Sequence, residues 1–282
     1  MKQGFININK ASGDPSTRPV GQMKRCTHMP CGHMGTLDPL ASGVLPVGVG
    51  RATRLFDYFL DKKKTYIATF LFGEDYDTLD ITGRLSKTGG YVPTKEEVAS
   101  VLPQFIGEIG QVPPKFSAKC VNGRRGYELA RSGVDFELAA KTIRIDDIEL
   151  LDIKDNAFRF AIDCGGGTYI RSLGRDIAAA VHTTAAMSAL CRTRSGVFTI
   201  EKAVPMEQIT EENVESYIVP TEDVLPFARI SLNDAAMRKI LCGVPVLADY
   251  ADGLYKLFLS DGSFYGVAEV QSGLAKVKIK LC

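Results

Sequence analysis

The sequence predicts an α+β fold built on a mixed, largely antiparallel sheet. Strand-like and helix-like segments are interspersed along the 282 residues, but they do not alternate in the regular order that a parallel sheet requires. Hydrophobic residues make up 45% of the chain, which is enough to bury a substantial core. From residue 227 onward the strand-like runs are short and separated by turns. We therefore expect two domains, a large one over 1–226 and a small β-rich one over 227–282.

Two strands are expected in the first third of the chain. The N-terminus leads directly into the strand-like segment Phe5–Ile8, without the hydrophobic core of a signal peptide. The run Thr65–Gly73 is rich in aromatic and β-branched residues and ends at a glycine, as a largely buried strand should. Tyr66 is therefore placed at the start of a strand.

Two helices are expected in the middle of the chain. Thr94 followed by Glu97 is a capping-box signal, and Pro103 should bend or shorten the helix that follows. Further along, a strand over 158–163 runs into the glycine turn 165–167 and then into a second helix. Apolar residues mark one face of that helix at Leu173, Ile177 and Val181.

The last part of the chain should form a connector and a small β-rich module. The acidic, proline-punctuated stretch 201–226 is predicted to connect the two domains and to include a short helix. A helix is expected over 232–241. Asp-Gly and Ser-Gly turns separate the strands expected at 254–259, 264–268 and 276–279.

Composition and charge indicate a cytoplasmic protein with an uneven surface charge. No apolar run approaches the roughly 20 residues that span a bilayer, and seven scattered cysteines favour reduced thiols over a disulfide framework. The net charge is only +1. Residues 1–64, however, hold ten bases against four acids, whereas residues 201–235 hold eight acids against two bases. One face can therefore attract a polyanion such as a nucleic acid.

Two cysteines and two histidines, Cys26, His28, Cys31 and His33, lie within eight residues. Their side chains are zinc-ligand types, but the spacing lacks the separated pairs of a zinc finger or ribbon. We therefore expect no metal. Zinc-dependent nucleic-acid binding is the alternative, and it predicts about one zinc ion per chain.

A basic segment with two aromatic residues suits an RNA-binding surface. Residues 115–131 carry five bases and one acid, together with Phe116 and Tyr127. Phosphates and stacked bases are bound by such mixtures of cationic and aromatic side chains. Taken alone, the segment is better explained as an exposed loop and helix with solvated charges.

Asp38 is the chain's best candidate for a catalytic group. It lies in the glycine-rich, almost uncharged stretch 32–45, where the backbone must bend tightly or approach a ligand. Read alone, Asp38 followed by Pro39 also suits an ordinary turn. A second candidate stretch is 165–171, in which Tyr169 and Arg171 would project on one face of an extended segment.

Several of these motifs occur together in the order found in one enzyme family. The chain resembles the TruB family of bacterial tRNA pseudouridine synthases over about residues 4–200. The matching segments are 4–10, 32–45, 50–54, 64–66, 111–118 and 167–171. The string Gly-His-Met-Gly-Thr-Leu-Asp-Pro-Leu-Ala-Ser-Gly-Val-Leu is the most specific of them, and ordered recurrence of several motifs favours a catalytic Asp38 over a turn.

The resemblance implies an isomerase that converts uridine 55 in the TΨC loop of tRNA to pseudouridine, with no cofactor. Asp38 matches the aspartate that attacks or deprotonates the ribose of the target nucleotide. Arg171 matches the arginine that pairs with this aspartate, and an opposite charge would orient it and keep it ionised. Tyr169 matches the tyrosine that takes the proton from carbon 5 of uracil.

Four further residues match substrate-binding positions of the family. Tyr66 matches the tyrosine that stacks on the target base, and Leu190 matches an apolar residue against the pocket. The target base must be flipped out of its loop, and His33 matches the histidine that helps to hold that arrangement. Lys10 matches a lysine after the first strand, as a pocket or phosphate contact. The C-terminal module resembles, more weakly, a PUA-like RNA-binding domain.

Four departures from the family pattern fall outside the catalytic residues, and one of them is Asp-Pro-Ser-Thr at 14–17, where the family commonly has Thr-Ser. The sequence Asn-Lys-Ala-Ser-Gly at 9–13 replaces the usual Asp-Lys-Pro-x-Gly and puts the conformation of that loop in doubt. Phe116 stands where a tyrosine is common, which removes a hydroxyl. Cys191 stands where an arginine is common, so one phosphate contact would be lost.

The leading hypothesis is a monomeric enzyme that modifies tRNA without an obligate protein partner. One alternative is the same chemistry on another RNA, for example as a guide-RNA-dependent subunit. A second alternative is an RNA-binding protein that keeps the fold and has lost turnover. The sequence leaves open whether Asp38 acts as nucleophile or base.

Overall fold

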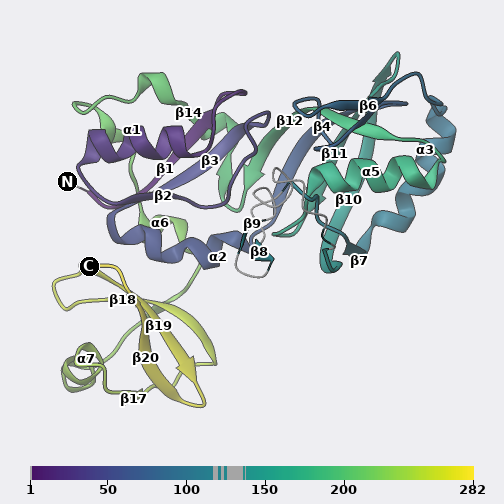
Figure 1. Cartoon of the computed structure of the whole chain (residues 1–282). Helices are drawn as coiled ribbons and strands as arrows, with labels where there is room; N and C mark the ends of the chain where they lie inside the picture. Colours follow the sequence, from purple (N-terminus) through teal and green to yellow (C-terminus); the bar gives the residue numbers. More distant parts are fainter. Residues whose placement is uncertain (1, 117–119, 122–123, 126–135, 137) are drawn as a thin grey trace.

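A computed structural model describes residues 2–116, 120–121, 124–125, 136 and 138–282. In this part of the chain, eleven strands form one large sheet (Figure 1). Their bounds are β1 (Gly4–Lys10), β2 (Cys31–His33), β3 (Ser42–Val49), β4 (Lys64–Phe72), β7 (Gly107–Gln111), β10 (Lys141–Lys154), β11 (Ala157–Cys164), β12 (Ala185–Ser195), β13 (Phe198–Thr199), β14 (Val204–Pro205) and β15 (Val219–Pro220).

The large sheet is mixed and mostly antiparallel, which confirms the predicted fold class. Its main order is β14-β1-β3-β12-β4-β11-β10-β7, with β2 beside β3, β13 beside β12 and β15 beside β1. The pairs β1–β14 and β3–β12 are parallel, and the remaining pairs are antiparallel. The seam between β3 and β12 is short, with the register pairs Ser42–Cys191 and Gly43–Arg192.

One face of the β4 half of the sheet is covered by helices (Figure 1). Along β4, buried and half-buried residues alternate, as the two-residue period of a strand with one covered face requires. The covered face packs against α5 (Ile170–Ala180) and α3 (Lys95–Val101). A Cβ at Gly174 would lie 2.3 Å from the Phe70 ring, so only glycine lets α5 approach β4 this closely.

The β1 half of the sheet is buried on both faces. Helix α1 (Thr17–Thr27) packs with one side of β1 through a cluster that includes Ile6, Ile8 and Met23. The other side contacts the turn η1 (Gly50–Leu55) and helix α2 (Phe56–Leu60), where Phe5 and Phe59 meet with ring centroids 4.8 Å apart. The polar Asn7 within β1 is also buried, and its amide donates to the Thr199 carbonyl at 2.8 Å.

The C-terminal residues form a second sheet of five strands in the order β16-β18-β19-β20-β17. Its elements are β16 (Arg229–Ile230), α7 (Asp234–Leu241), β17 (Val246–Leu247), β18 (Gly253–Phe258), β19 (Phe264–Gln271) and β20 (Leu274–Lys280). Val267 and Leu281 share a buried cluster with Phe5 and Leu55 of the large domain. The division at 226/227 into separate domains and the PUA-like character of the second stay predictions.

Most expected elements are present, and their ends follow the predicted signals. Thr94 and Glu97 form the capping box of α3. That helix ends at Val101, and Pro103 lies in the short turn η2 (Leu102–Phe105). The stretch 201–226 was predicted as a connector with a short helix, and within it β14 and β15 also extend the sheet at β1, which the sequence did not predict.

Several smaller elements complete the described chain. The hairpin strands β5 (Asp75–Tyr76) and β6 (Leu85–Lys87) pair with each other, as do β8 (Cys120–Val121) and β9 (Arg124–Arg125). The stretch 201–226 also holds η3 (Ile200–Lys202), η4 (Met206–Gln208), η5 (Val214–Tyr217) and helix α6 (Thr221–Val224), which is the short helix expected there. Most of the basic segment 115–131 lies outside the described residues. None of the described helices is both long and apolar enough to cross a membrane.

Candidate active site

Asp38 is presented by a tight loop between β2 and β3. The main chain turns at Asp38, whose carbonyl oxygen accepts a hydrogen bond from the Ala41 amide at 3.0 Å. Ser16 holds the residue before it, because its hydroxyl accepts from the Leu37 amide at 2.9 Å and donates to the Leu37 carbonyl at 2.8 Å. The turn and the catalytic interpretations are therefore compatible: the backbone forms the turn and the side chain, 38% exposed, reaches outward.

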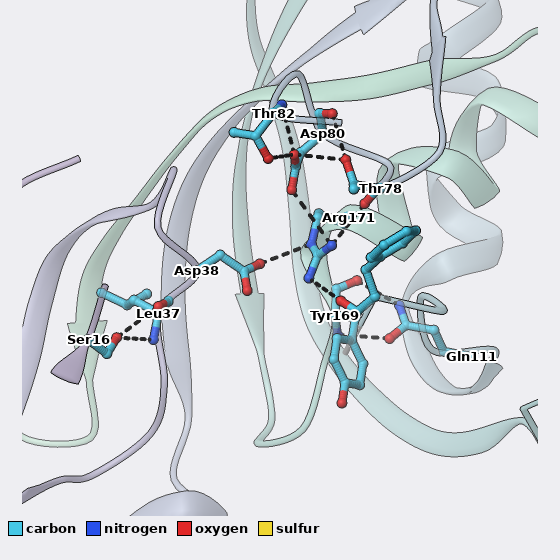
Figure 2. Close-up of polar contacts among 10 residues, drawn as sticks. Ser16, Leu37, Asp38, Thr78, Asp80, Thr82, Gln111, Tyr169 and Arg171 are labelled. Carbon is cyan, nitrogen blue, oxygen red and sulfur yellow. Dashed lines mark hydrogen bonds and ion pairs between the residues drawn. The ribbon is translucent and has the colours of Figure 1, made fainter. Parts of the chain in front are cut away.

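Arg171 binds the Asp38 carboxylate from the opposite side of the site. It lies in the first turn of α5, and 7% of its side chain is exposed. Its Nε is 2.9 Å from Asp38 Oδ2. Its two terminal nitrogens donate to the carbonyls of Thr78 at 2.8 Å and Phe116 at 3.1 Å. The guanidinium thus has a fixed orientation before any substrate binds (Figure 2).

Asp80 is a second carboxylate on the same guanidinium, and it was not among the residues predicted from the sequence. Its Oδ2 lies 3.6 Å from Arg171 Nη1, and 6% of its side chain is exposed. Its other oxygen accepts from the Thr78 hydroxyl at 3.0 Å and from the Thr82 amide at 2.9 Å. The Thr-x-Asp-x-Thr spacing at 78–82 was the available signal, since hydroxyls two residues away commonly bond an aspartate in a turn.

The two carboxylates and one guanidinium carry a net charge of −1. Figure 2 shows Asp38 and Asp80 approaching Arg171 from different sides. Because Asp80 is buried and anchored whereas Asp38 is partly exposed, Asp80 fixes the guanidinium and Asp38 is the carboxylate available to a substrate.

Tyr169 is placed by the backbone at the start of α5. It is the N-cap residue of that helix and is half-buried. Its amide donates to Gln111 Oε1 at 2.8 Å, and its carbonyl accepts from Gln111 Nε2 at 3.1 Å. Tyr169 and Arg171 thus lie at the same helix end. The sequence predicted an extended segment that would place both on one face, but the start of α5 places them instead.

Tyr66 and Leu190 lie in the same buried cluster as Leu37, the neighbour of Asp38. They come from adjacent strands, where Leu190 pairs with Ala68 and Arg192 with Tyr66. Tyr66 is 8% exposed. Burial raises the pKa of the Tyr66 phenol, against a smaller lowering by the Arg192 charge and hydrogen bond. The phenol is therefore neutral at physiological pH, and its ring can serve as an uncharged stacking surface.

Arg192 is a fully buried cation beneath the Asp38 loop. It was not among the residues predicted from the sequence. It donates to the Val44 carbonyl at 2.7 Å and to the Gly35 carbonyl at 3.1 Å. It also hydrogen-bonds the hydroxyl of Tyr66. One side chain therefore joins β12, β3, the loop and the proposed stacking residue. The neighbouring Cys191, a departure from the family pattern, is half-buried and alternates with Arg192 along the strand.

Lys10 and His33 flank this arrangement. The Lys10 ammonium, 1% exposed, donates to the carbonyls of Ala11 at 2.9 Å, Asp14 at 2.5 Å and Pro39 at 3.3 Å. These bonds use its three donors and support the Asp38 loop from below. Burial lowers the pKa of His33. Within the described residues no hydrogen bond or ion pair joins His33 to Asp38. The substrate-binding roles of Lys10 and His33 stay predictions.

The residues considered for zinc point to different neighbours. Cys26 and Cys31 are buried free thiols, whereas His28 lies at the surface with Nε2 2.8 Å from Glu211 Oε1. In the part of the chain that the structure describes, no group of three or more histidines, cysteines or acids is arranged to hold a metal ion.

Lys64, at the start of β4, gives the fold a pH dependence that can be measured. Its ammonium, 5% exposed, bonds the carbonyls of Lys62 at 2.7 Å and Leu60 at 2.5 Å, where α2 ends. Burial lowers its pKa to about 8. Between that value and the pKa near 10.4 of an unfolded lysine, the unfolded chain binds more protons, so stability rises with pH.

We expect the free energy of unfolding of the wild type, relative to Lys64→Met, to rise by about 2 kcal/mol between about pH 7 and 9.5. Urea titrations of both proteins at the two pH values measure this difference, and groups common to both cancel. A difference that is constant or falls with pH would contradict a buried Lys64 ammonium.

Comparison with known proteins identifies the family. Residues 24–170 match a family model described as TruB family pseudouridylate synthase (N terminal domain). A protein of Clostridium kluyveri named tRNA pseudouridine synthase B is 36% identical over 272 residues, covering 94% of each chain. A protein of the same name from Acaryochloris marina is 37% identical and covers 99% of this chain and 98% of its own.

Solved structures share the fold. A chain in an H/ACA RNP bound to a substrate RNA containing 2′-deoxyuridine superposes with a TM-score of 0.72 at 24% identity, covering 99% of this chain and 85% of its own. A chain in a Cbf5–Nop10–Gar1 complex also gives 0.72, at 25% identity, with 99% and 84% covered. The similarity therefore extends through the C-terminal sheet.

Proposed function

The chain belongs to the TruB family of pseudouridylate synthases, which are isomerases, and on that premise we propose that it converts uridine 55 in the TΨC loop of tRNA to pseudouridine without a cofactor. The observation that carries the proposal is the Asp38 carboxylate, held at 2.9 Å by a buried arginine at the rim of an apolar cluster. An ionised carboxylate can act as nucleophile or base without a metal.

The proposed reaction rearranges one nucleotide and consumes no other reactant. The target base leaves its stack and enters the site. Asp38 acts on the ribose as nucleophile or base, the bond between C1′ and uracil N1 breaks, and uracil C5 then bonds to C1′. The proton on C5 is removed and N1 gains a proton. Substrate and product are therefore isomers.

The apolar cluster beside Asp38 supports the base-binding part of the proposal. Tyr66 offers a neutral ring, and stacking of a base on an aromatic ring contributes about 1–3 kcal/mol. Leu190 and Leu37 belong to the same buried cluster, and a base bound against them would displace water, which strengthens electrostatic interactions between Asp38, Arg171 and the substrate. We assign Tyr169, beside Arg171, as the group that accepts the proton from C5.

The test is to incubate an unmodified tRNA, tritiated at uridine C5, with the protein alone. We expect tritium release equivalent to one uridine per tRNA, and pseudouridine mapped to position 55. A tRNA with cytidine at that position is the matched control and should release none. Release only after a guide RNA or a second protein is added would favour the guide-dependent alternative, and RNA binding without release would favour the non-catalytic one.

A further inference from the structure

A single buried amide holds both polar groups of the Tyr169 backbone. Gln111, the last residue of β7, is 1% exposed. Its Oε1 accepts from the Tyr169 amide at 2.8 Å, and its Nε2 donates to the Tyr169 carbonyl at 3.1 Å. Helix α5 has no side-chain cap of its own at this residue. Gln111 therefore supplies from outside the helix the bond to the N-cap amide that the N3 side chain of a capping box would make.

Gln111 itself cannot move freely, because the residues around it are fixed to the sheet and to α5. Its main chain pairs with Lys141 in β10. The next carbonyl, of Val112, accepts from the Ser172 hydroxyl at 2.9 Å and from Arg175 Nη2 at 3.0 Å. Four residues further on, the Phe116 carbonyl accepts from Arg171. The segment 111–116 is thus bound along the first turns of α5, with the Gln111 amide facing Tyr169 (Figure 2).

We infer that Gln111 is a positioning residue, which sets the direction in which Tyr169 leaves the backbone and so aligns its phenol with carbon 5 of the target base. This inference rests on the proposed function. Two hydrogen bonds to the backbone of Tyr169 restrain the rotation of this residue. A single bond would still let the residue turn about the axis of that bond. Proton transfer requires the acceptor within hydrogen-bond reach of the carbon-bound proton, so a small error in this direction matters.

The same device serves Asp38. Ser16 bonds both polar backbone groups of Leu37, as Gln111 bonds both of Tyr169. The two reactive side chains are therefore each placed by a buried polar residue from another element. This parallel provides a comparison, because Ser16→Ala should slow the step at the ribose and Gln111→Met should slow the step at C5.

The experiment measures single-turnover rates on tRNA carrying hydrogen or deuterium at C5 of the target uridine. Gln111→Met removes both bonds, and Gln111→Glu keeps an acceptor for the amide but has no donor for the carbonyl. We expect the Gln111→Met rate to fall about 10- to 100-fold, with the ratio of the hydrogen to the deuterium rate larger than in Ser16→Ala. Gln111→Glu should show the same change in ratio, and it is the second variant if Gln111→Met folds poorly.

Gln22→Met is the structural control. It removes the two hydrogen bonds that the Gln22 amide in α1 donates to the carbonyls of Met206 and Ile209, both at 2.9 Å, without touching Gln111 or Tyr169. It should lower the free energy of unfolding by about 1 kcal/mol and leave the wild-type isotope ratio unchanged. A purely structural role for Gln111 would reduce the active fraction, and so the amplitude of the turnover, without changing that ratio.

The outcomes separate the two proposals. If the wild type turns over but the isotope ratio of Gln111→Met is no larger than that of Ser16→Ala, the inference is overturned and the proposed function stays intact. Failure of the wild type to form pseudouridine would remove the proposed function, and the inference with it.

Discussion

Asp38→Asn is expected to reduce turnover by roughly 10⁴-fold or more while the protein stays folded and still binds tRNA. The amide has the shape of the carboxylate but lacks its charge and its basicity, and loss of a nucleophile or base costs on this order. Folding should change by less than about 1 kcal/mol, because the Asp38 side chain is partly exposed and Arg171 retains Asp80. Tritium release under single-turnover conditions measures the loss.

Asp57→Asn is the matched control for this prediction. Asp57 is an exposed aspartate on α2, and its loss of charge should leave the turnover rate within about twofold of the wild type, because surface substitutions away from a site are nearly neutral. Normal turnover by Asp38→Asn would remove Asp38 from the reaction altogether. Equal losses in both variants would point to a general effect of negative charge.

Arg171→Met should both abolish turnover and destabilise the fold. The substitution leaves Asp80 buried without its positive neighbour, and removal of one partner from a buried ion pair costs about 3–5 kcal/mol. It also frees Asp38 and leaves the carbonyls of Thr78 and Phe116 without their guanidinium donor. Urea denaturation measures the stability loss, and single-turnover tritium release measures the catalytic one.

A second substitution separates these two effects. Asp80→Asn in the Arg171→Met background removes the uncompensated charge and should restore about 1–3 kcal/mol of stability without restoring turnover. Arg159→Met is the surface control, since the Arg159–Asp152 pair at 3.2 Å is about half exposed on both sides and should be worth less than about 1 kcal/mol. A similar stability loss for Arg159→Met and Arg171→Met would contradict the buried network.

Segments with strong local signals were predictable from the sequence. The alternation of β4 follows its aromatic and β-branched run, and the capping box of α3 is formed by the predicted pair Thr94 and Glu97. Strands β3 and β12 were not predicted. β3 contains Pro46 and glycines, and β12 carries serine, threonine and arginine. Their strand conformation comes from pairing with distant segments, which local sequence does not encode.

The same distinction applies to the site. The sequence pattern identified Asp38 and Arg171, and the structure joins them directly. It did not identify Asp80, Arg192 or Gln111, because each acts through a residue far along the chain: Asp80 through Arg171, Arg192 through Gly35 and Gln111 through Tyr169. A buried polar residue is recognisable only once the fold shows what surrounds it.

The short seam between β3 and β12 makes the site sensitive to the relative twist of the two halves of the sheet. Asp38 belongs to the β3 half and Arg171 to the helix that packs on the β4 half, while the parallel ladder between them is two residue pairs long. A Cβ at Gly43 would lie 2.3 Å from the Arg192 carbonyl oxygen, so the seam is also tightly closed. A rotation about it would separate the carboxylate from the guanidinium and would also disturb the buried cluster that spans the seam, because Leu37 packs there with Tyr66 and Leu190. The alignment of the two charged groups and the packing across the seam are therefore coupled.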